Sequence, residues 1–252
     1  MARSHEHFMS EYSIINALAI AWFFAAWIGY TLFTKYQAKR GLNLSAVLNE
    51  QRLNWMEQVI TRDNRVMDAT LVANLERNAS FLASTCILVL AGLLTALGIA
   101  DDITSVLQTF PFYEIKENSA LWLHLKILML ILIYVYAFFA LTWSMRQYGF
   151  ASVMIGSAPN PDKALANPEL KAKYVYSSSK VIDMAGHAYN YGLRAYYFSL
   201  AVLPWFISPW FFMLSTSFVV IILYSREFHS RPLKVIGTYV KYCSEGGNNC
   251  KN

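Results

Sequence analysis

The chain has 252 residues, of which 56% are hydrophobic and only 15% are charged, and its formal net charge is +5. A soluble domain carries about 25% charged residues, and the deficit falls in long charge-free blocks, which excludes an ordinary soluble core and indicates a membrane protein. Because the basic residues crowd the loops beside these blocks and no recognition motif accompanies them, we expect no nucleic-acid partner.

Three apolar blocks are each long enough to cross a bilayer as one helix. They lie at 14–33, 81–100 and 121–145, and about 20 helical residues span a hydrocarbon core of about 30 Å. Backbone groups in lipid must be hydrogen-bonded within the segment, so these blocks are predicted to be helices. The first block exceeds the apolar region of a secretory signal and its basic residues follow it, so we interpret it as a retained span.

A fourth apolar block, 195–224, is too long for one upright span and contains Pro204 and Pro209, which can kink or end a helix. Two interpretations stay open. Either one kinked, tilted helix crosses once, or a hairpin places crossing segments at about 186–207 and 209–228. The hairpin is favoured, because it alone returns the basic C-terminal tail to the side of the other basic loops.

The distribution of Lys and Arg predicts the orientation. The connections before the second span and after the third are rich in basic residues, whereas 101–120 holds Lys116 as its one basic residue. We therefore expect the N-terminus outside and both large loops and the C-terminus in the cytoplasm, with the protein in the inner (plasma) membrane. The predicted fold class is an all-α polytopic membrane protein with four to five transmembrane helices over residues 1–230 and a cytoplasmic tail at 231–252.

The first large loop is predicted to be helical. From Leu48 to Leu75 apolar residues recur at helical spacing, with a break near Asp63 and Asn64. Such an amphipathic helix either packs against other helices of the same protein or lies on the inner leaflet and contacts a partner. The second loop, at 158–170, is rich in Pro and Asn and is predicted to be an irregular connector.

A candidate binding site combines polar residues expected at the inner face. Arg77 and Asn78 precede the second span, and His187, Asn190 and Arg194 share one helical face because they are three, four and seven residues apart. Either these residues form an interfacial belt that anchors lipid phosphates, or they form a site for an anionic ligand or lipid headgroup.

Lys126 is the one charge inside a predicted span, and such residues are functional candidates. Because it lies about one turn into the span, we expect it to extend to the outer interface, toward the acidic residues at 101–102.

No catalytic residue, metal site or cofactor is predicted. A membrane haem needs two histidines at one depth, and His124 lies at the opposite end from His187. His187 and His229 both lie near the inner face in the hairpin interpretation, so that pair remains open. His5 and His7 are of the type that suits copper or zinc, but an N-terminal stretch of this kind often carries such a motif by chance.

Three segments, RNASFLAST (77–85), HAYNYGLRAYYFSLA (187–201) and YSREFHS (224–230), resemble a family of bacterial membrane proteins catalogued as domain of unknown function 599. The resemblance extends from the first span to just past Ser230. It implies an integral membrane location and transfers neither an activity nor catalytic residues.

Three function classes follow. The first is a non-enzymatic membrane module that binds lipids or a partner and forms a homo-oligomer or a complex with another membrane protein. The second is a small transporter or channel, because helices broken at prolines such as Pro204 and Pro209 often form ion and substrate sites. The third is a membrane redox or metal-dependent enzyme. We expect the first.

Overall fold

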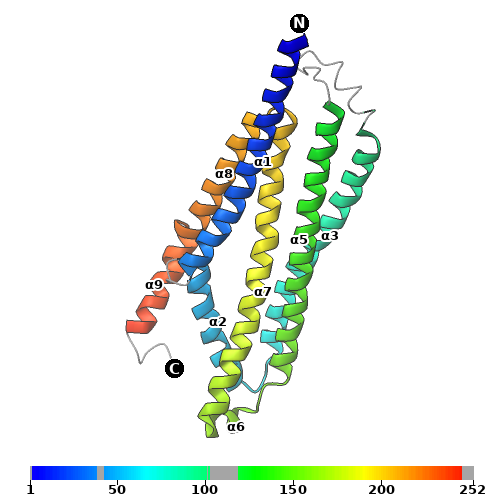
Figure 1. Ribbon diagram of the computed structural model, residues 1–252. Coiled ribbons are helices and arrows are strands. Elements are labelled where there is room, and N and C mark those ends of the chain that lie inside the picture. Colours follow the sequence, from blue (N-terminus) through cyan, green and yellow to red (C-terminus); the bar gives the residue numbers. More distant parts are fainter. Residues whose placement is uncertain (1, 39–42, 101, 103–118, 246–252) are drawn as a thin grey trace. The chain divides into compact units, whose positions relative to one another are not determined.

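The computed structural model describes residues 2–38, 43–100, 102 and 119–245, and side chains for 13–38, 43–100, 102, 121–240 and 242. Within these residues the regular secondary structure is entirely helical (Figure 1), which confirms the predicted all-α class. The chain forms two compact units. Unit 1 comprises Met1–Thr31, Ser84–Phe138 and Gly192–Ile221, and unit 2 comprises Leu32–Ala83, Phe139–Tyr191 and Ile222–Asn252.

Four helical stretches of the described chain are long and apolar enough to cross a membrane, as predicted. They are Ser13–Ala38, Val66–Gly98, Leu121–Gly156 and Pro209–Val240, and they belong to helices α1 (Ala2–Ala38), α3 (Val66–Gly98), α5 (Ser119–Gly156) and α8 (Pro209–Phe228), the last stretch continuing past the end of α8. Helix α7 (Pro168–Val202) is not among them, because polar Tyr, His, Asn and Arg side chains crowd its second half. The fifth crossing segment therefore stays a prediction.

Helices α3 and α5 extend well beyond the predicted spans. Helix α3 begins at Val66 instead of residue 81, and α5 continues to Gly156 instead of ending at residue 145. The extensions are amphipathic and bury Val72, Ala151 and Ile155 in the core of unit 2. A hydropathy average detects the part of a helix that is apolar all round. It misses helical residues whose apolar side chains lie on one face and pack against the protein.

The long fourth block is two helices separated by a turn, not one kinked helix. Within unit 1, α7 is followed by the short helix η1 (Leu203–Phe206), and α8 begins at Pro209. The carbonyl of Pro204 accepts hydrogen bonds from Ile207 N and Ser208 N. The Ser215 hydroxyl of α8 then donates to the carbonyl of Ala201 at 2.7 Å, so the two helices run back along each other.

The start of α7 differs from the expected one. The helix begins at Pro168, about five turns before residue 186. Proline is favoured in the first helical turn, and the side chain of Asn167 accepts a hydrogen bond from Leu170 N at 3.1 Å. The predicted irregular connector contains the short helix α6 (Pro161–Ala166).

Aromatic side chains hold unit 1 together. The rings of Trp27 and Phe198 are stacked at 5.0 Å, and those of Trp205 and Phe212 at 4.8 Å. The indole N–H of Trp205 donates to the side chain of Asn16 at 2.7 Å, and both residues are fully buried. This bond satisfies two polar groups that would otherwise be costly to bury among apolar side chains.

Unit 2 is organised around helix α2 (Leu44–Thr61). Its residues Met56, Val59 and Ile60 are fully buried in a cluster that also contains residues of α3, α5, α6 and α7. The predicted loop helix is therefore two helices, because the chain leaves α2 at Arg62 and re-enters a helix at Val66. Of the two interpretations of its apolar face, packing within the protein is confirmed for these residues.

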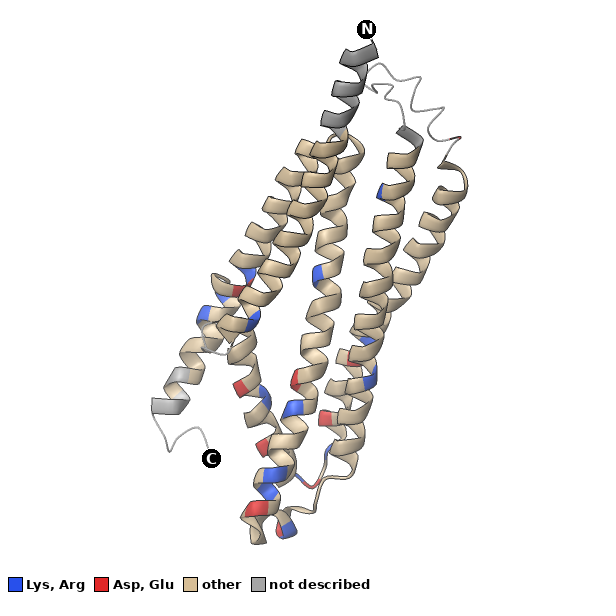
Figure 2. Ribbon diagram, viewed as in Figure 1, with Lys and Arg blue, Asp and Glu red and all other residues tan. Residues whose placement is uncertain are grey.

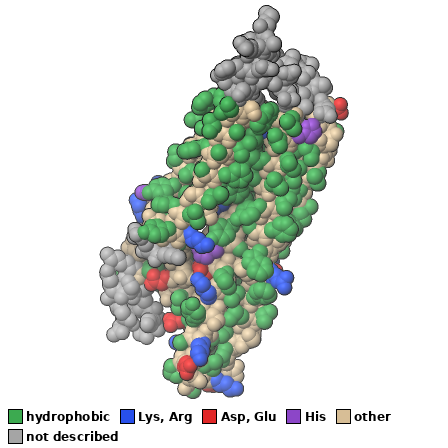
Figure 3. All heavy atoms as spheres, in the orientation of Figure 1, with side chains coloured by type: hydrophobic (Ala, Val, Ile, Leu, Met, Phe, Trp, Pro, Cys, Tyr) green, Lys and Arg blue, Asp and Glu red, His purple; other side chains and the backbone are tan. Residues whose placement is uncertain are grey.

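Charged and apolar residues are distributed unevenly over the described helices. Figure 2 shows the charged residues mainly on the helices of unit 2 and few on the described part of unit 1. Apolar side chains cover much of the surface shown in Figure 3, and exposed examples on the long helices include Phe81, Leu88, Phe139 and Leu214. Exposed apolar side chains along long helices are expected where lipid replaces water as the solvent.

Candidate functional site

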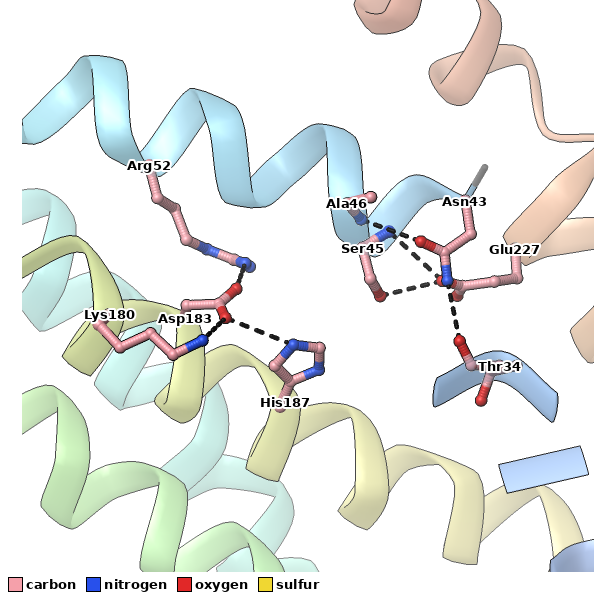
Figure 4. A network of polar contacts seen from close by, with 9 residues as sticks. All are labelled: Thr34, Asn43, Ser45, Ala46, Arg52, Lys180, Asp183, His187 and Glu227. Atoms are coloured by element: carbon pink, nitrogen blue, oxygen red, sulfur yellow. Dashed lines mark hydrogen bonds and ion pairs between the residues drawn. The ribbon is translucent and has the colours of Figure 1, made fainter. Parts of the chain in front are cut away.

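A buried carboxylate in unit 2 gathers three basic side chains. Asp183 of α7 accepts a hydrogen bond from Nη1 of Arg52, on α2, at 2.7 Å through Oδ1. Its Oδ2 lies 3.5 Å from Nζ of Lys180 and 3.5 Å from Nε2 of His187 (Figure 4). We call these four residues the Asp183 cluster.

The local sequence of α7 builds three members of this cluster. Lys180, Asp183 and His187 are separated by three and four residues, so they lie on one helical face. Gly186 leaves room for the fourth, because a Cβ atom there would lie 2.6 Å from Nη2 of Arg52. The absence of a side chain at residue 186 thus allows the guanidinium of α2 to approach α7 closely.

The cluster contains more positive than negative charge. Burial raises the pKa of Asp183, but the hydrogen bond and charge of His187, followed by the charges of Arg52 and Lys180, together outweigh it and hold the pKa of this carboxyl below its usual value. Asp183 is therefore ionised at neutral pH. Arg52 and Lys180 contribute two positive charges against its single negative one, before any protonation of His187.

The excess positive charge faces outward. The side chain of Asp183 is 3% exposed, whereas those of Lys180 and His187 are 52% and 37% exposed. A lysine ammonium has three N–H donors, and Asp183 accepts one of those of Lys180. The cluster thus has a buried anionic centre and an accessible cationic edge.

A second buried carboxylate fixes the end of α2. Asp68, on α3, is fully buried, and its Oδ1 accepts from Nη1 of Arg62 at 2.7 Å and from Nε1 of Trp55 at 2.8 Å. Its Oδ2 has no hydrogen-bond partner in the described part of the chain. Arg65 adds three bonds to backbone carbonyls, to Val59 of α2 and to Ala158 and Pro159 before α6. These contacts define a structural junction.

The start of α2 is fixed in the same way. Asn43 is its N-cap, accepting from Ala46 N at 3.0 Å and donating to the carbonyl of Thr34 at 3.3 Å (Figure 4). Oε1 of Glu227, from the end of α8, accepts from the backbone N and the hydroxyl of Ser45. A carboxylate at a helix N-terminus is favourable because it satisfies free N–H groups and meets the positive end of the helix dipole.

The residues of the predicted inner-face site lie on α3 and along α7. His187 belongs to the Asp183 cluster, and Asn190 lies half-buried one turn further along α7. Arg77 and Asn78 are exposed on α3, and no contact among the described residues joins them to the cluster. Arg194 belongs to unit 1, where its guanidinium lies 5.2 Å from the ring centre of Tyr30.

Lys126 is more enclosed than expected. Its side chain is 7% exposed, and Nζ lies 5.5 Å and 5.7 Å from the ring centres of Trp205 and Phe206 in unit 1. Aromatic faces attract a cation in this geometry, and the expected extension to the interface stays a prediction. Of the two expected acidic neighbours, Asp101 lies outside the described residues.

The histidines whose side chains are described have different surroundings. The ring of His229 lies 5.4 Å from that of Tyr224, whereas His187 faces Asp183. His124 belongs to unit 1, and the side chains of His5 and His7 lie outside those described. Among the described residues, no group of three or more His, Cys, Asp or Glu side chains is placed to hold a metal ion.

Sequence reasoning missed Arg52, Lys180 and Asp183. The helical spacing could have identified two of them, because Asp183 lies one turn and Lys180 two turns before His187 on the same face of α7. Arg52 had no such signal. It is separated from Asp183 by 131 residues, and only the packing of α2 against α7 brings the two together.

The comparisons with known proteins give a family and no activity. The family described as "Protein of unknown function, DUF599" matches residues 18–232. That match contains α2, α7 and the whole Asp183 cluster, and it ends just inside the C-terminal helix α9 (Arg231–Glu245). Neither the curated proteins nor the solved structures contain a match to the chain.

Proposed function

The chain belongs to the DUF599 family of proteins of unknown function, and we propose that it is a non-enzymatic membrane module that binds an anionic lipid headgroup at the Asp183 cluster. The observation that supports this proposal is the arrangement of three basic side chains around one buried carboxylate, with two of them accessible from outside.

The chemistry of the cluster fits a phosphate group. Asp183 orients the side chains of Lys180 and His187 through its contacts with them. Its single negative charge neutralises only part of the positive charge of the cluster. A phosphate oxygen accepts charge-assisted hydrogen bonds from an ammonium or imidazolium group, and these are about twice as strong as neutral ones. Asn190, one turn along the same helix, is a further polar group within the proposed headgroup region.

The proposed location follows from charge and hydropathy. Four stretches of the described chain suit a bilayer, and the basic loops favour the inner leaflet of a plasma membrane for unit 2. Anionic lipids enriched in that leaflet would then meet the cationic edge of the cluster. Arg77, Asn78 and Arg194 are proposed as further lipid contacts, because none of them is a member of the cluster.

Native mass spectrometry of the protein in mild detergent tests the proposal. Phosphatidylglycerol should remain bound more strongly than phosphatidylcholine, and Lys180→Gln should reduce that retention about tenfold, which corresponds to about 1.4 kcal/mol. Lys173→Gln is the matched control, because Lys173 is on the same helix but is paired with Glu169 in an exposed ion pair.

The outcomes separate the sources of the phosphate group. If inorganic phosphate at millimolar concentration displaces the lipid completely, the ligand is a free phosphate and the lipid assignment fails. Equal retention by the wild-type protein and by both Lys180→Gln and His187→Gln would reject the Asp183 cluster as the site. The same spectra report the number of chains in the assembly, which tests the expected oligomer.

A further inference from the structure

Helix α9 has an apolar face that the rest of the structure covers only in part. It contacts α2, and Val240 is buried. On the neighbouring flank, Val235, Tyr239 and Tyr242 recur at spacings of four and three residues, so they form one strip along the helix. Their side chains are 70%, 55% and 62% exposed. We call these three residues the α9 strip.

Basic residues lie beside the α9 strip, on the side of the helix away from the buried Val240, with Arg231 one turn before Val235. Arg231 and Lys234 are exposed and lie three residues apart, and Lys241 follows Lys234 by seven residues, so all three positions share one face. The helix contains one acidic residue, Glu245, at its end. Helix α9 is therefore a cationic amphipathic helix whose exposed aromatic residues lie between its basic side and its buried side. This arrangement suits a helix that lies in a membrane interface.

The position of α9 in the chain supports a membrane as its partner. It follows α8 after only two residues, and the apolar stretch that could cross a membrane runs from Pro209 to Val240. Ser230 starts a new helix instead of extending α8, because its hydroxyl accepts a hydrogen bond from Leu233 N at 3.3 Å. The chain thus passes from α8 into a cationic amphipathic helix within one stretch that suits a membrane.

We propose that α9 lies in the plane of an anionic membrane surface, with the α9 strip inserted at headgroup depth and its basic residues paired with lipid phosphates. Tyrosine is enriched at that depth because its ring is apolar and its hydroxyl is polar. Lys and Arg attract anionic lipids there. A second copy of the chain fits this surface poorly, because it would bring like charges on Arg231 and Lys234 together. This surface does not involve the Asp183 cluster, and the two proposals stand independently.

Hydrogen exchange of the full chain in lipid nanodiscs tests this surface. Backbone amides of α9 are expected to exchange at least tenfold more slowly in nanodiscs containing phosphatidylglycerol than in nanodiscs of phosphatidylcholine alone. The double variant Arg231→Glu, Lys234→Glu should remove this difference, so that the ratio of the two rates approaches one. Lys163→Glu, an exposed charge reversal on α6 of the same unit, should preserve it.

A second variant separates insertion from charge alone. Val235→Ser with Tyr239→Ser keeps every charge of α9 and should reduce the lipid-dependent protection severalfold, while unchanged exchange in α5 shows that the fold is intact. Equal exchange of α9 in both lipid compositions would overturn the proposal. Protection that requires two protein copies per nanodisc would assign the strip to a protein interface instead, and loss of the difference in Lys163→Glu would show that net charge alone is responsible.

Discussion

Helices α2 and α9 contact each other within unit 2, but their apolar faces differ in what covers them. Met56, Val59 and Ile60 of α2 are fully buried, whereas Val235, Tyr239 and Tyr242 of α9 are largely exposed. The difference arises from how each helix is attached. Asn43 and Glu227 fix the start of α2, while α9 follows α8 and has its main described contact with α2.

This comparison shows that an amphipathic pattern specifies a buried face without specifying what buries it. A helix fixed at both ends must turn its apolar side toward its own protein, because any other orientation would break the junctions. A helix attached mainly at its start can present the same kind of face to lipid. Three experiments test how firmly α2 is held and whether the two helices differ in this way.

The largest effect is expected from Asp68→Ala, at the second junction of α2. It should lower the free energy of unfolding by about 4 kcal/mol, because Trp55 and the partly exposed Arg62 both lose their acceptor. Each donor left without a partner costs about 1–3 kcal/mol. Denaturant titration in mild detergent measures the change. Glu169→Ala, in an exposed pair with Lys173, should cost about 0.5 kcal/mol or less. A loss for Asp68→Ala as small as that of the control would show that the junction does not stabilise α2.

A matched pair of truncations compares the two apolar faces directly. Met56→Ala should cost about 3 kcal/mol, because it leaves a cavity in the core of unit 2. Val235→Ala should change stability by at most about 0.5 kcal/mol in detergent, because its side chain is exposed. Similar losses for both variants would mean that α9 is packed as tightly as α2 and would remove the basis of the comparison.

The smallest effect concerns the Asp183 cluster, which joins α2 to α7. Because the pKa of Asp183 is lowered in the folded protein, its stabilisation is fully present above its unfolded pKa of about 3.9 and is lost as the pH falls through the lower folded value. Each unit of lowering corresponds to about 1.4 kcal/mol. The unfolding free energy measured from pH 6 to pH 3 should therefore fall more steeply in the wild type than in Asp183→Asn. Parallel curves would contradict the role of Arg52, Lys180 and His187 in holding the charge.

The candidate site shows where sequence patterns succeed and where they stop. The spacing along α7 identified His187 as part of a polar face, and the same rule extended backward reaches Asp183 and Lys180. The grouping with Arg194 stays a prediction, and Arg194 itself packs on Tyr30 in unit 1. One helical face can run through two separately packed units, and periodicity alone does not reveal where one unit ends.

By itself, the sequence determined the all-α class and the four apolar stretches, because helix length and hydropathy act locally. It favoured a turn near Pro204 without deciding it, and the structure shows that turn. The sequence also determined family membership over residues 18–232. Only the tertiary structure decided that α3 and α5 continue beyond their apolar parts, that Arg52 reaches Asp183 across 131 residues, and which amphipathic helix stays exposed. These features depend on which faces meet in three dimensions, and a pairing between distant residues leaves no periodic signal along the chain.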